Sequence, residues 1–444
     1  MTRNKKGSKL NLLPPGSFFN RMAERIKVLI VGDGAREHAI GWKIKKDSAD
    51  VKLFFAPGNG GTGLIGDNKE IEATDIDKLL AFAKDQGIDF TIVGPEKPLE
   101  MGVVDAFREA RKEIFGHTKK AAVLETSKAA AIRFMRGHHI PHPESKIFSD
   151  REAVEAFVMN CPWKEIVVKA SGLAAGKGVI LPDTSEKAIA AIRRIMVDRE
   201  FDDAGEEIVI QKREYGKEVS VIGFISNEIG LLVPAQDYKR ALDGDEGKNT
   251  GGMGAYAPNV HLNDKVMQEI WASVLLPTQK GAIKDGFPLT GIIYAGLMLT
   301  IDGPKVLEYN MRFGDPETQV QLRLLESNLL KSMKKTINGT LTKDDYRSSN
   351  KACVGVVLAS EGYPGKPVTG RTVKGLDTNY GDDIVIFHAG TKKEGDEFVS
   401  SGGRVSTVTA TGETREEARQ KIYPKLENGL ISLGGGHWRK DIAE

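Results

Sequence analysis

Two lysines and a run of glycines between residues 167 and 181 are well suited to bind phosphate. The segment reads VVKASGLAAGKGVIL, with Lys169 at the end of an apolar run and Lys177 among the glycines. A P-loop would need a different glycine spacing, a Ser or Thr where Gly178 stands, and a helix afterwards. The strand-forming sequence Val179-Ile180-Leu181 follows instead. We therefore predict a strand–glycine loop–strand hairpin that closes over a polyphosphate.

A carboxylate and an amide alternate in LEYNMRFGDPE, residues 307–317. On a strand, Glu308 and Asn310 would share one face, and their oxygens suit Mg²⁺, which also takes ligands from phosphates and water. Arg312 follows on that face. Taken alone, such a pair is more often found on an exposed strand, so the metal prediction depends on the upstream lysines. Asp315-Pro316 is typical of a helix N-cap followed by proline at the first helical position.

The segment QDYKRALDGDEGKNTGGMGAYAP, residues 236–258, is rich in glycine and charge. Its DGDEG stretch has the composition of a calcium loop, but Gly254 stands where the bidentate Glu would be. We predict a substrate-binding loop built around Asp237, Lys239 and Arg240. A solvated charged loop is the alternative.

Two glycine loops follow the first two predicted strands. GDGAREH, residues 32–38, lies where a dinucleotide fingerprint would, but Glu37 replaces its third glycine, so no nicotinamide cofactor is expected. Backbone N–H groups at a helix N-terminus could still bind phosphate, with Arg36 adding a contact. A tight turn with a surface arginine is the alternative. GNGGT, residues 58–62, would add a second anion-binding loop at the same sheet edge.

The elements that must position these residues form a multidomain α/β and α+β protein. Alternating strands and helices predict a parallel α/β domain over residues 26–125. Residues 126–347 have a mixed pattern that starts with a helix near Ser127, and residues 348–444 form a C-terminal mixed domain. We predict that residues 1–25 form a flexible basic extension. An organelle-targeting peptide is the alternative.

Length and composition limit the classes of protein. At 444 residues the chain has room for about three domains. A net charge of +2 without a continuous basic face argues against nucleic-acid binding, and no apolar run reaches the ~18 residues that cross a bilayer. Cys161 and Cys353 are isolated, and the histidines lack metal-ligand spacing. We expect a cytoplasmic protein with small-molecule substrates, as a monomer or weak dimer.

From Lys27 to about Ile442 the chain closely resembles the glycinamide ribonucleotide synthetase (phosphoribosylamine–glycine ligase) family of ATP-grasp enzymes. The segments that carry this resemblance are VGDGAREHAI, APGNGGT, VGPEKPL, LETSKAAAIRFM, VVKASGLAAGKGV, QDYKRALDGDEGKNTGGMGAYAP, EYNMRFGDPETQ, EGYPGKP and HWRKDI. The resemblance implies an N-terminal domain, an ATP-grasp core with a mobile lid at about 145–213, and a C-terminal domain. It implies that ATP, Mg²⁺ (or Mn²⁺), glycine and 5-phosphoribosylamine react through glycyl phosphate in de novo purine (IMP) biosynthesis.

The resemblance also implies residue roles. The catalytic residues would be Lys169, Lys177 and Arg312. ATP would be bound by Lys128, Lys169, Gly176, Lys177, Gly178 and Glu218, and the metal by Glu308 and Asn310. Substrate would be bound by Gly32, Gly34, Arg36, Gly58, Asn59, Asp237, Lys239, Arg240, Asn249, Gly251, Gly252 and Asp315.

Three departures from the family pattern affect these roles. Ser171 stands where the family usually has Asp, His117 replaces a proline, and Gln211-Lys212-Arg213-Glu214 replaces an acidic, apolar hinge beside adenine. The expected result is altered ATP affinity rather than lost activity. Another ATP-grasp carboxylate–amine ligase and a non-catalytic nucleotide-binding protein are the alternatives.

Overall fold

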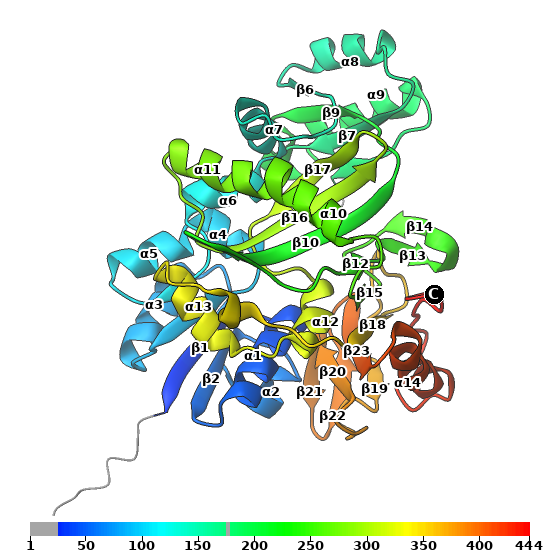
Figure 1. Cartoon of the computed structure of the whole chain (residues 1–444). Helices are drawn as coiled ribbons and strands as arrows, with labels where there is room; N and C mark the ends of the chain where they lie inside the picture. Colours follow the sequence, from blue (N-terminus) through cyan, green and yellow to red (C-terminus); the bar gives the residue numbers. More distant parts are fainter. Residues whose placement is uncertain (1–24, 175–177) are drawn as a thin grey trace, which may run out of the picture.

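The computed structural model describes residues 25–174 and 178–444. The predictions for Gly176, Lys177 and the extension before residue 25 therefore lie outside the described residues. Figure 1 shows a parallel α/β part and an antiparallel part with many strands at the bottom, a central sheet above them, and a smaller sheet with its helices at the top. In this view the lower edge of the central sheet lies next to loops of the two lower parts.

The N-terminal part is a parallel sheet in the order β3-β2-β1-β4-β5, which confirms the predicted parallel sheet. Its strands are β1 (Ile26–Gly32), β2 (Val51–Pro57), β3 (Asp67–Asn68), β4 (Phe90–Val93) and β5 (Ile114–Phe115). The helices are α1 (Ala35–Asp47), α2 (Thr62–Ile65), α3 (Ile76–Asp85), α4 (Glu96–Met101) and α5 (Val103–Glu109). Apolar runs form these strands because both sheet faces are covered. The carboxyl ends of β1 and β2 meet, and Gly58 N donates to Gly32 O at 3.2 Å.

The central sheet is antiparallel in the order β11-β10-β16-β17. Its strands are β10 (Lys217–Ile225), β11 (Ile229–Leu231), β16 (Gly291–Thr300) and β17 (Gly303–Asn310). It packs against α6 (Lys119–Thr126), α7 (Lys128–Gly137), α10 (Asp264–Ile270) and α11 (Leu276–Lys284), with a π-helical segment Trp271–Leu275 joining the last two. Ser127 caps α7 by accepting from Ala130 N at 3.1 Å, so this helix starts where the sequence predicts.

The uppermost sheet has the order β6-β9-β7-β8 and its own apolar core. Its elements are β6 (Ser145–Phe148), α8 (Arg151–Met159), β7 (Ile166–Ala170), β8 (Val179–Ile180), α9 (Ser185–Met196), a 3₁₀ turn (Asp202–Gly205) and β9 (Ile208–Lys212). Strands β7 and β8 are antiparallel, with Lys169 opposite Val179. The predicted strand–loop–strand hairpin is therefore confirmed on both sides of the residues that are not described.

The C-terminal part contains two antiparallel sheets, in the orders β12-β15-β18-β23-β20 and β21-β22-β19-β24. The helices of this half are α12 (Glu317–Leu324), α13 (Leu329–Ile337), a 3₁₀ turn (Lys343–Tyr346) and α14 (Arg415–Glu427). The strands past residue 350 are β18 (Ala352–Ala359), β19 (Thr372–Lys374), β20 (Ile384–His388), β21 (Thr391–Glu394), β22 (Glu397–Ser400), β23 (Arg404–Gly412) and β24 (Ser432–Leu433).

Segment 236–258 is not the continuous loop that the sequence predicts. It contains β12 (Gln236–Asp237), β13 (Arg240–Leu242), a 3₁₀ turn (Asp243–Asp245), β14 (Glu246–Asn249) and β15 (Gly254–Ala257). Strands β13 and β14 form a hairpin, while β15 pairs with both β12 and β18. The prediction is wrong because glycine content suggests a loop, whereas the buried residues of β15 join a sheet whose other strands lie far along the sequence.

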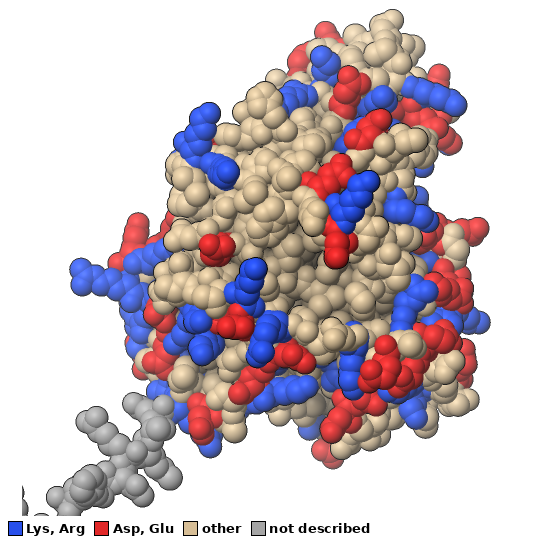
Figure 2. All heavy atoms as spheres, viewed as in Figure 1, with Lys and Arg blue, Asp and Glu red and all other residues tan. Residues whose placement is uncertain are grey.

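No helix in residues 25–174 and 178–444 is long and apolar enough to cross a membrane. Lysine and arginine are interspersed with aspartate and glutamate on the face shown in Figure 2, where no continuous basic surface is visible.

His117 links the end of the N-terminal sheet to β16. Its Nε2 donates to Ile292 O at 2.8 Å and its Nδ1 accepts from Thr290 N at 3.3 Å, so the ring is held as the neutral Nε2–H tautomer. Burial lowers the pKa of His117 to about 4. The residue that departs from the resembled family thus supplies two hydrogen bonds that a proline ring cannot form.

We expect His117→Gln to flatten the acid dependence of stability. The folded-state pKa lies below the ordinary 6.5, so the stabilising contribution is complete above pH 6.5 and is lost as pH falls through about 4. That separation corresponds to at most about 3 kcal/mol. Melting temperatures of both proteins between pH 7 and pH 4.5 test this. His388, with a pKa also lowered to about 4, leaves part of the slope in the variant; equal slopes would contradict the prediction.

Candidate active site

Strand β17 presents Glu308 and Asn310 two positions apart, as predicted. Glu308 lies opposite Gly296 of β16, where a Cβ would come within 3.2 Å of Glu308 Cγ, so glycine leaves room for the carboxylate. Burial alone would raise the pKa of Glu308, but Lys239 and Lys128 outweigh it and hold the pKa below its ordinary value. Within the described residues no three His, Cys, Asp or Glu side chains gather as a metal cluster. A carboxylate and an amide oxygen fit Mg²⁺ if substrate phosphates and water complete the shell.

Two lysines from different elements face this strand. Lys169, on β7, donates to Leu307 O at 3.2 Å, next to Glu308. Lys128, the first residue of α7, donates to Gly172 O at 3.4 Å. Burial lowers the pKa of Lys169 to about 8, opposed by the charge of Glu308. The structure therefore brings together the lysine and the acid that the sequence separates by more than a hundred residues.

Ser171, the departure beside these lysines, is part of the N-terminus of α7. Its hydroxyl accepts from Ala129 N at 3.1 Å and lies 3.2 Å from the Ser127 hydroxyl. Its carbonyl accepts from Lys128 N at 2.7 Å. A serine here satisfies a free helix N–H as an aspartate would, and it keeps Lys128 at the site without adding negative charge.

Arg312 lies just beyond β17 in a network of acids that the sequence reasoning missed. Its guanidinium pairs with Glu96 at 3.2 Å and Glu125 at 3.1 Å, and donates to Asn310 Oδ1 at 3.2 Å. Burial would raise the pKa of Glu96, but Arg312 and Arg36 bring it to about 2. Arg312 therefore fixes the direction of the Asn310 side chain. Nothing in the local sequence around Glu96 or Glu125 indicates this pairing.

The departures at residues 211–214 find partners within the chain. Gln211 donates to Ser145 Oγ at 3.1 Å, Arg213 pairs with Glu165 at 2.8 Å, and Glu214 pairs with Lys305 at 2.9 Å. Glu218, on the next strand, forms an ion pair with Lys239. The altered hinge is thus stabilised without an acidic, apolar sequence.

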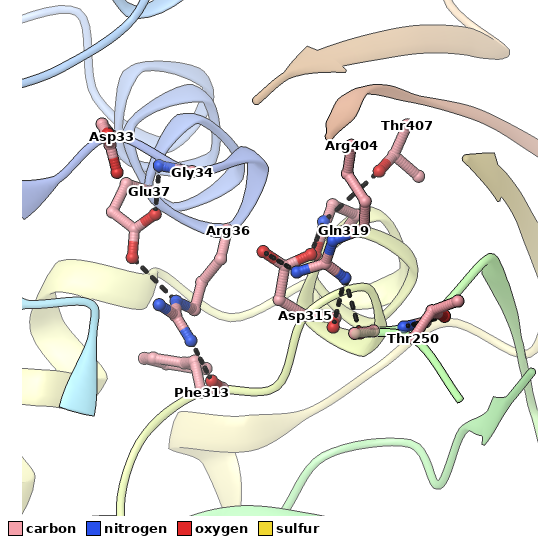
Figure 3. A network of polar contacts seen from close by, with 12 residues as sticks. Asp33, Gly34, Arg36, Glu37, Thr250, Phe313, Asp315, Gln319, Arg404 and Thr407 are labelled. Carbon is pink, nitrogen blue, oxygen red and sulfur yellow. Dashed lines mark hydrogen bonds and ion pairs between the residues drawn. The ribbon is translucent and has the colours of Figure 1, made fainter. Parts of the chain in front are cut away.

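The glycine loop after β1 does not present Arg36 to a ligand, contrary to the phosphate interpretation. Arg36 is turned inward, where its Nε pairs with Glu37 at 2.7 Å and its Nη1 donates to Phe313 O at 3.0 Å (Figure 3). Glu37 also accepts from Gly34 N at 2.7 Å. The acid that replaces the third glycine therefore takes up the N–H and the cation that a phosphate would need. Gly32, at φ +125°, leaves the space that the Glu37 side chain fills.

Asn59, in the second glycine loop, joins the two lower parts of the molecule. Its amide donates to Asp33 O at 2.7 Å and to His388 O at 2.9 Å, while its oxygen accepts from Gly61 N at 2.9 Å. The neighbouring Gly58 has φ +77°, and a Cβ there would lie 2.3 Å from Asn68 Oδ1. These contacts shape the wall of a pocket rather than leave free donors in it.

A pocket of about 270 Å³ lies between these loops and the C-terminal sheet. Its lining residues before the C-terminal part are Asp33, Gly34, Gly58, Asn59 and Asp315, and those from the C-terminal part are Ala389, Gly390, Thr391, Ser401, Gly402 and Arg404. Four of them, Gly34, Gly58, Asn59 and Asp315, are predicted substrate residues. The C-terminal residues were missed, although the small residues directly before Arg404 indicate a close approach.

Arg404 holds two parts of this pocket together (Figure 3). It donates to Asp315 O at 2.8 Å and to Gly251 O at 2.6 Å, and pairs with the Asp315 carboxylate at 3.3 Å. The predicted N-cap role of Asp315 is wrong: α12 begins at Glu317, and Asp315 accepts from the Gln319 side chain at 2.7 Å instead. The carboxylate is therefore aimed at the pocket by Arg404 and Gln319.

Segment 236–258 contributes some of its predicted residues and not others. Lys239 lies 3.9 Å from Glu308 on β17. Gly252 lies close to Asp237, where a Cβ would come within 2.8 Å of Asp237 Oδ1. Burial, and then the charge of Glu317, raise the pKa of Asp237 well above its ordinary value. Arg240 and Asn249 lie opposite each other in the β13–β14 hairpin, where Arg240 Nη1 donates to Gly247 O at 2.7 Å.

A strand–loop–strand hairpin lies next to a central antiparallel sheet, and lysines face β17, the strand that carries Glu308. This arrangement is that of an ATP-grasp protein. Residues 126–318 match "Phosphoribosylglycinamide synthetase, ATP-grasp (A) domain", and residues 26–125 and 353–444 match the N and C domains of the same family. The chain belongs to the phosphoribosylglycinamide synthetase family.

Curated and solved relatives agree with this membership. A phosphoribosylamine–glycine ligase of Chlorobaculum tepidum is 43% identical, with 94% of this chain and 99% of that protein covered. The enzyme of the same name from Yersinia pestis is 45% identical, with 94% and 98% covered. The crystal structure of the Thermotoga maritima phosphoribosylamine–glycine ligase aligns with a TM-score of 0.82 at 32% identity, covering 94% of this chain and all of that one. A biotin carboxylase domain from Hydrogenobacter thermophilus, solved with MgADP, shares the fold at 15% identity and a TM-score of 0.73, over 93% of this chain and 91% of that one.

Proposed function

We propose that the chain is a phosphoribosylamine–glycine ligase, which joins glycine to 5-phosphoribosylamine and releases ADP and phosphate in de novo purine biosynthesis. The observation that carries this proposal is the approach of Lys169, on strand β7 of the hairpin, to the carbonyl of Leu307, directly before Glu308 on β17. Family membership and the identity to ligases of this name support the choice of substrates.

In this proposal glycine's carboxylate attacks the γ-phosphoryl group of ATP and forms glycyl phosphate. Lys128 and Lys169 offset phosphate charge. Glu308 and Asn310 would hold Mg²⁺ or Mn²⁺, which would supply further charge neutralisation. Arg312 positions Asn310. Lys177 and its glycines are assigned to the nucleotide from the sequence alone. The hairpin must exclude water, since acyl phosphates hydrolyse readily.

The pocket between the glycine loops and Arg404 is proposed to hold 5-phosphoribosylamine, whose amine then displaces phosphate from glycyl phosphate. Asp33 and Asp315, which line this pocket, suit hydroxyl and amine groups. We further propose the division 26–125, 126–347 with a lid at 145–213, and 348–444. A cytoplasmic location and a monomer or weak dimer complete the proposal.

A coupled ADP-release assay tests the function directly. Rapid ADP release is expected only with ATP, a divalent metal, glycine and freshly prepared phosphoribosylamine together. With hydroxylamine replacing phosphoribosylamine, glycine hydroxamate should form, because hydroxylamine traps an acyl phosphate. ADP release that ignores glycine would overturn the proposal. Release with a different carboxylate would assign another ATP-grasp ligase.

Arg404→Gln should weaken phosphoribosylamine binding specifically. The variant loses charged hydrogen bonds to Gly251 and Asp315, each worth about 1.5–3 kcal/mol, so we expect the KM for phosphoribosylamine to rise roughly tenfold or more. The KM values for ATP and glycine should change little. Lys392→Gln, at an exposed position on β21, is the matched control. Equal increases in all three KM values would contradict the pocket assignment.

A further inference from the structure

The ammonium of Lys239 lies between two carboxylates on different strands. It forms an ion pair with Glu218 of β10 and lies 3.9 Å from Glu308 Oε1 of β17, with β16 between those strands. Within the part of the chain that the structure describes, this is the single ion pair of Glu308. The candidate metal ligand therefore already faces a cation supplied by the protein.

The backbone of Lys239 is fixed while its side chain has room to move. Its carbonyl accepts from Thr250 N at 2.7 Å and from Thr250 Oγ1 at 2.9 Å, and the adjacent Tyr238 N donates to Gly254 O at 3.0 Å. The Lys239 side chain is nevertheless 31% exposed. A flexible four-carbon stem on a fixed backbone can shift its charge between neighbouring carboxylates.

Arg312, the protein cation beside the second candidate ligand, is held differently. Besides Asn310, it contacts Glu96, Glu125 and the Phe313 carbonyl, and its side chain is 17% exposed. It therefore cannot withdraw from Asn310 without depriving the half-buried Glu96 and the buried Glu125 of this cation. Lys239 can leave Glu308 and keep its bond to Glu218.

We propose that Lys239 is a positioning residue whose ammonium takes the place of the metal ion at Glu308 while the site is empty, and withdraws to Glu218 when the metal binds. The inference rests on the metal site of the proposed function. A divalent cation attracts Glu308 more strongly than an ammonium at 3.9 Å does. The displacement costs little because Glu218 still pairs with Lys239.

Titration with Mn²⁺ alone, followed by electron paramagnetic resonance without nucleotide, tests the proposal. Lys239→Met removes the competing cation, so its Mn²⁺ dissociation constant should be roughly two- to fivefold lower than that of the unmodified protein. Lys239→Arg keeps the charge and should bind Mn²⁺ like the unmodified protein. A merely structural lysine would give the opposite sign, because its loss would loosen the site. If Lys239→Met does not fold, as judged by circular dichroism, Lys239→Gln is titrated with the same expectation.

Two further variants separate the outcomes. Lys305→Met, on the same strand as Glu308 but paired with Glu214, should leave Mn²⁺ affinity unchanged. Glu308→Gln should lose Mn²⁺ binding. Unchanged or weaker Mn²⁺ binding by Lys239→Met, with binding lost in Glu308→Gln, overturns the role of Lys239 and leaves the metal site standing. Full binding by Glu308→Gln overturns both. These Mn²⁺ titrations measure binding alone and do not depend on enzymatic turnover.

Discussion

Replacing Glu308 with alanine should abolish ADP release while the fold is kept. Glu308 is the one carboxylate on strand β17. Its ionised form is favoured by Lys239, Lys128 and Lys169. Loss of one preorganised charge contact in such a site costs on the order of 10²–10³ in rate, and loss of the metal would add to this. Turnover is measured as glycine- and phosphoribosylamine-dependent ADP release at saturating Mg²⁺.

The control for this variant is Asp302→Ala, in the exposed turn before β17. Asp302 approaches Lys305 at 3.7 Å but does not face the lysines of the site. It should retain nearly full turnover, and both variants should have the same circular dichroism spectrum. If Glu308→Ala turns over as fast as the unmodified protein, Glu308 is not a metal ligand.

Lys169→Met should reduce kcat/KM for ATP by roughly 10² or more and also change its pH dependence. In the free protein, burial lowers the pKa of Lys169 to about 8. The ammonium is therefore present below that pH and is lost as pH rises through it, so kcat/KM for ATP in the unmodified protein should fall above pH 8. Because kcat/KM reports the ionisation of the free enzyme, this decrease should be absent in Lys169→Met.

Lys169→Arg provides the matched comparison for that prediction. An arginine keeps its charge throughout this range, so the variant should also lack the decrease above pH 8 while retaining more activity than Lys169→Met. If all three proteins lose activity in parallel above pH 8, another group causes the decrease.

The hairpin, strand β17 and the parallel sheet were predictable because each follows from short-range patterns. Apolar runs beside glycines mark β7 and β8, alternation places Glu308 and Asn310 on one face, and strand–helix alternation sets the N-terminal sheet. The meeting of the first two glycine loops then follows from parallel topology alone. The family resemblance, carried by longer segments, supplied the substrates, which no single motif specifies.

What the sequence did not predict depends on contacts between distant residues. Arg36 was expected to face a ligand, but a carbonyl 277 positions later turns it inward. Glu96 stands 216 positions from Arg312, and Arg404 stands 89 positions from Asp315. The packing of whole sheets decides which nearby partner a charged side chain pairs with. A single sequence does not show that packing.

The pairing of β15 with β18 has a consequence for how the chain can be divided. Strand β15 belongs to segment 236–258, yet it lies between β12 and β18 in the sheet, with Gly254 opposite Val356. Removing residues 348–444 would therefore bare a row of unpaired backbone groups along a formerly interior strand, which is a template for aggregation. The C-terminal part is thus woven into the remainder. A fragment ending at residue 347 is therefore expected to aggregate along the exposed edge of β15.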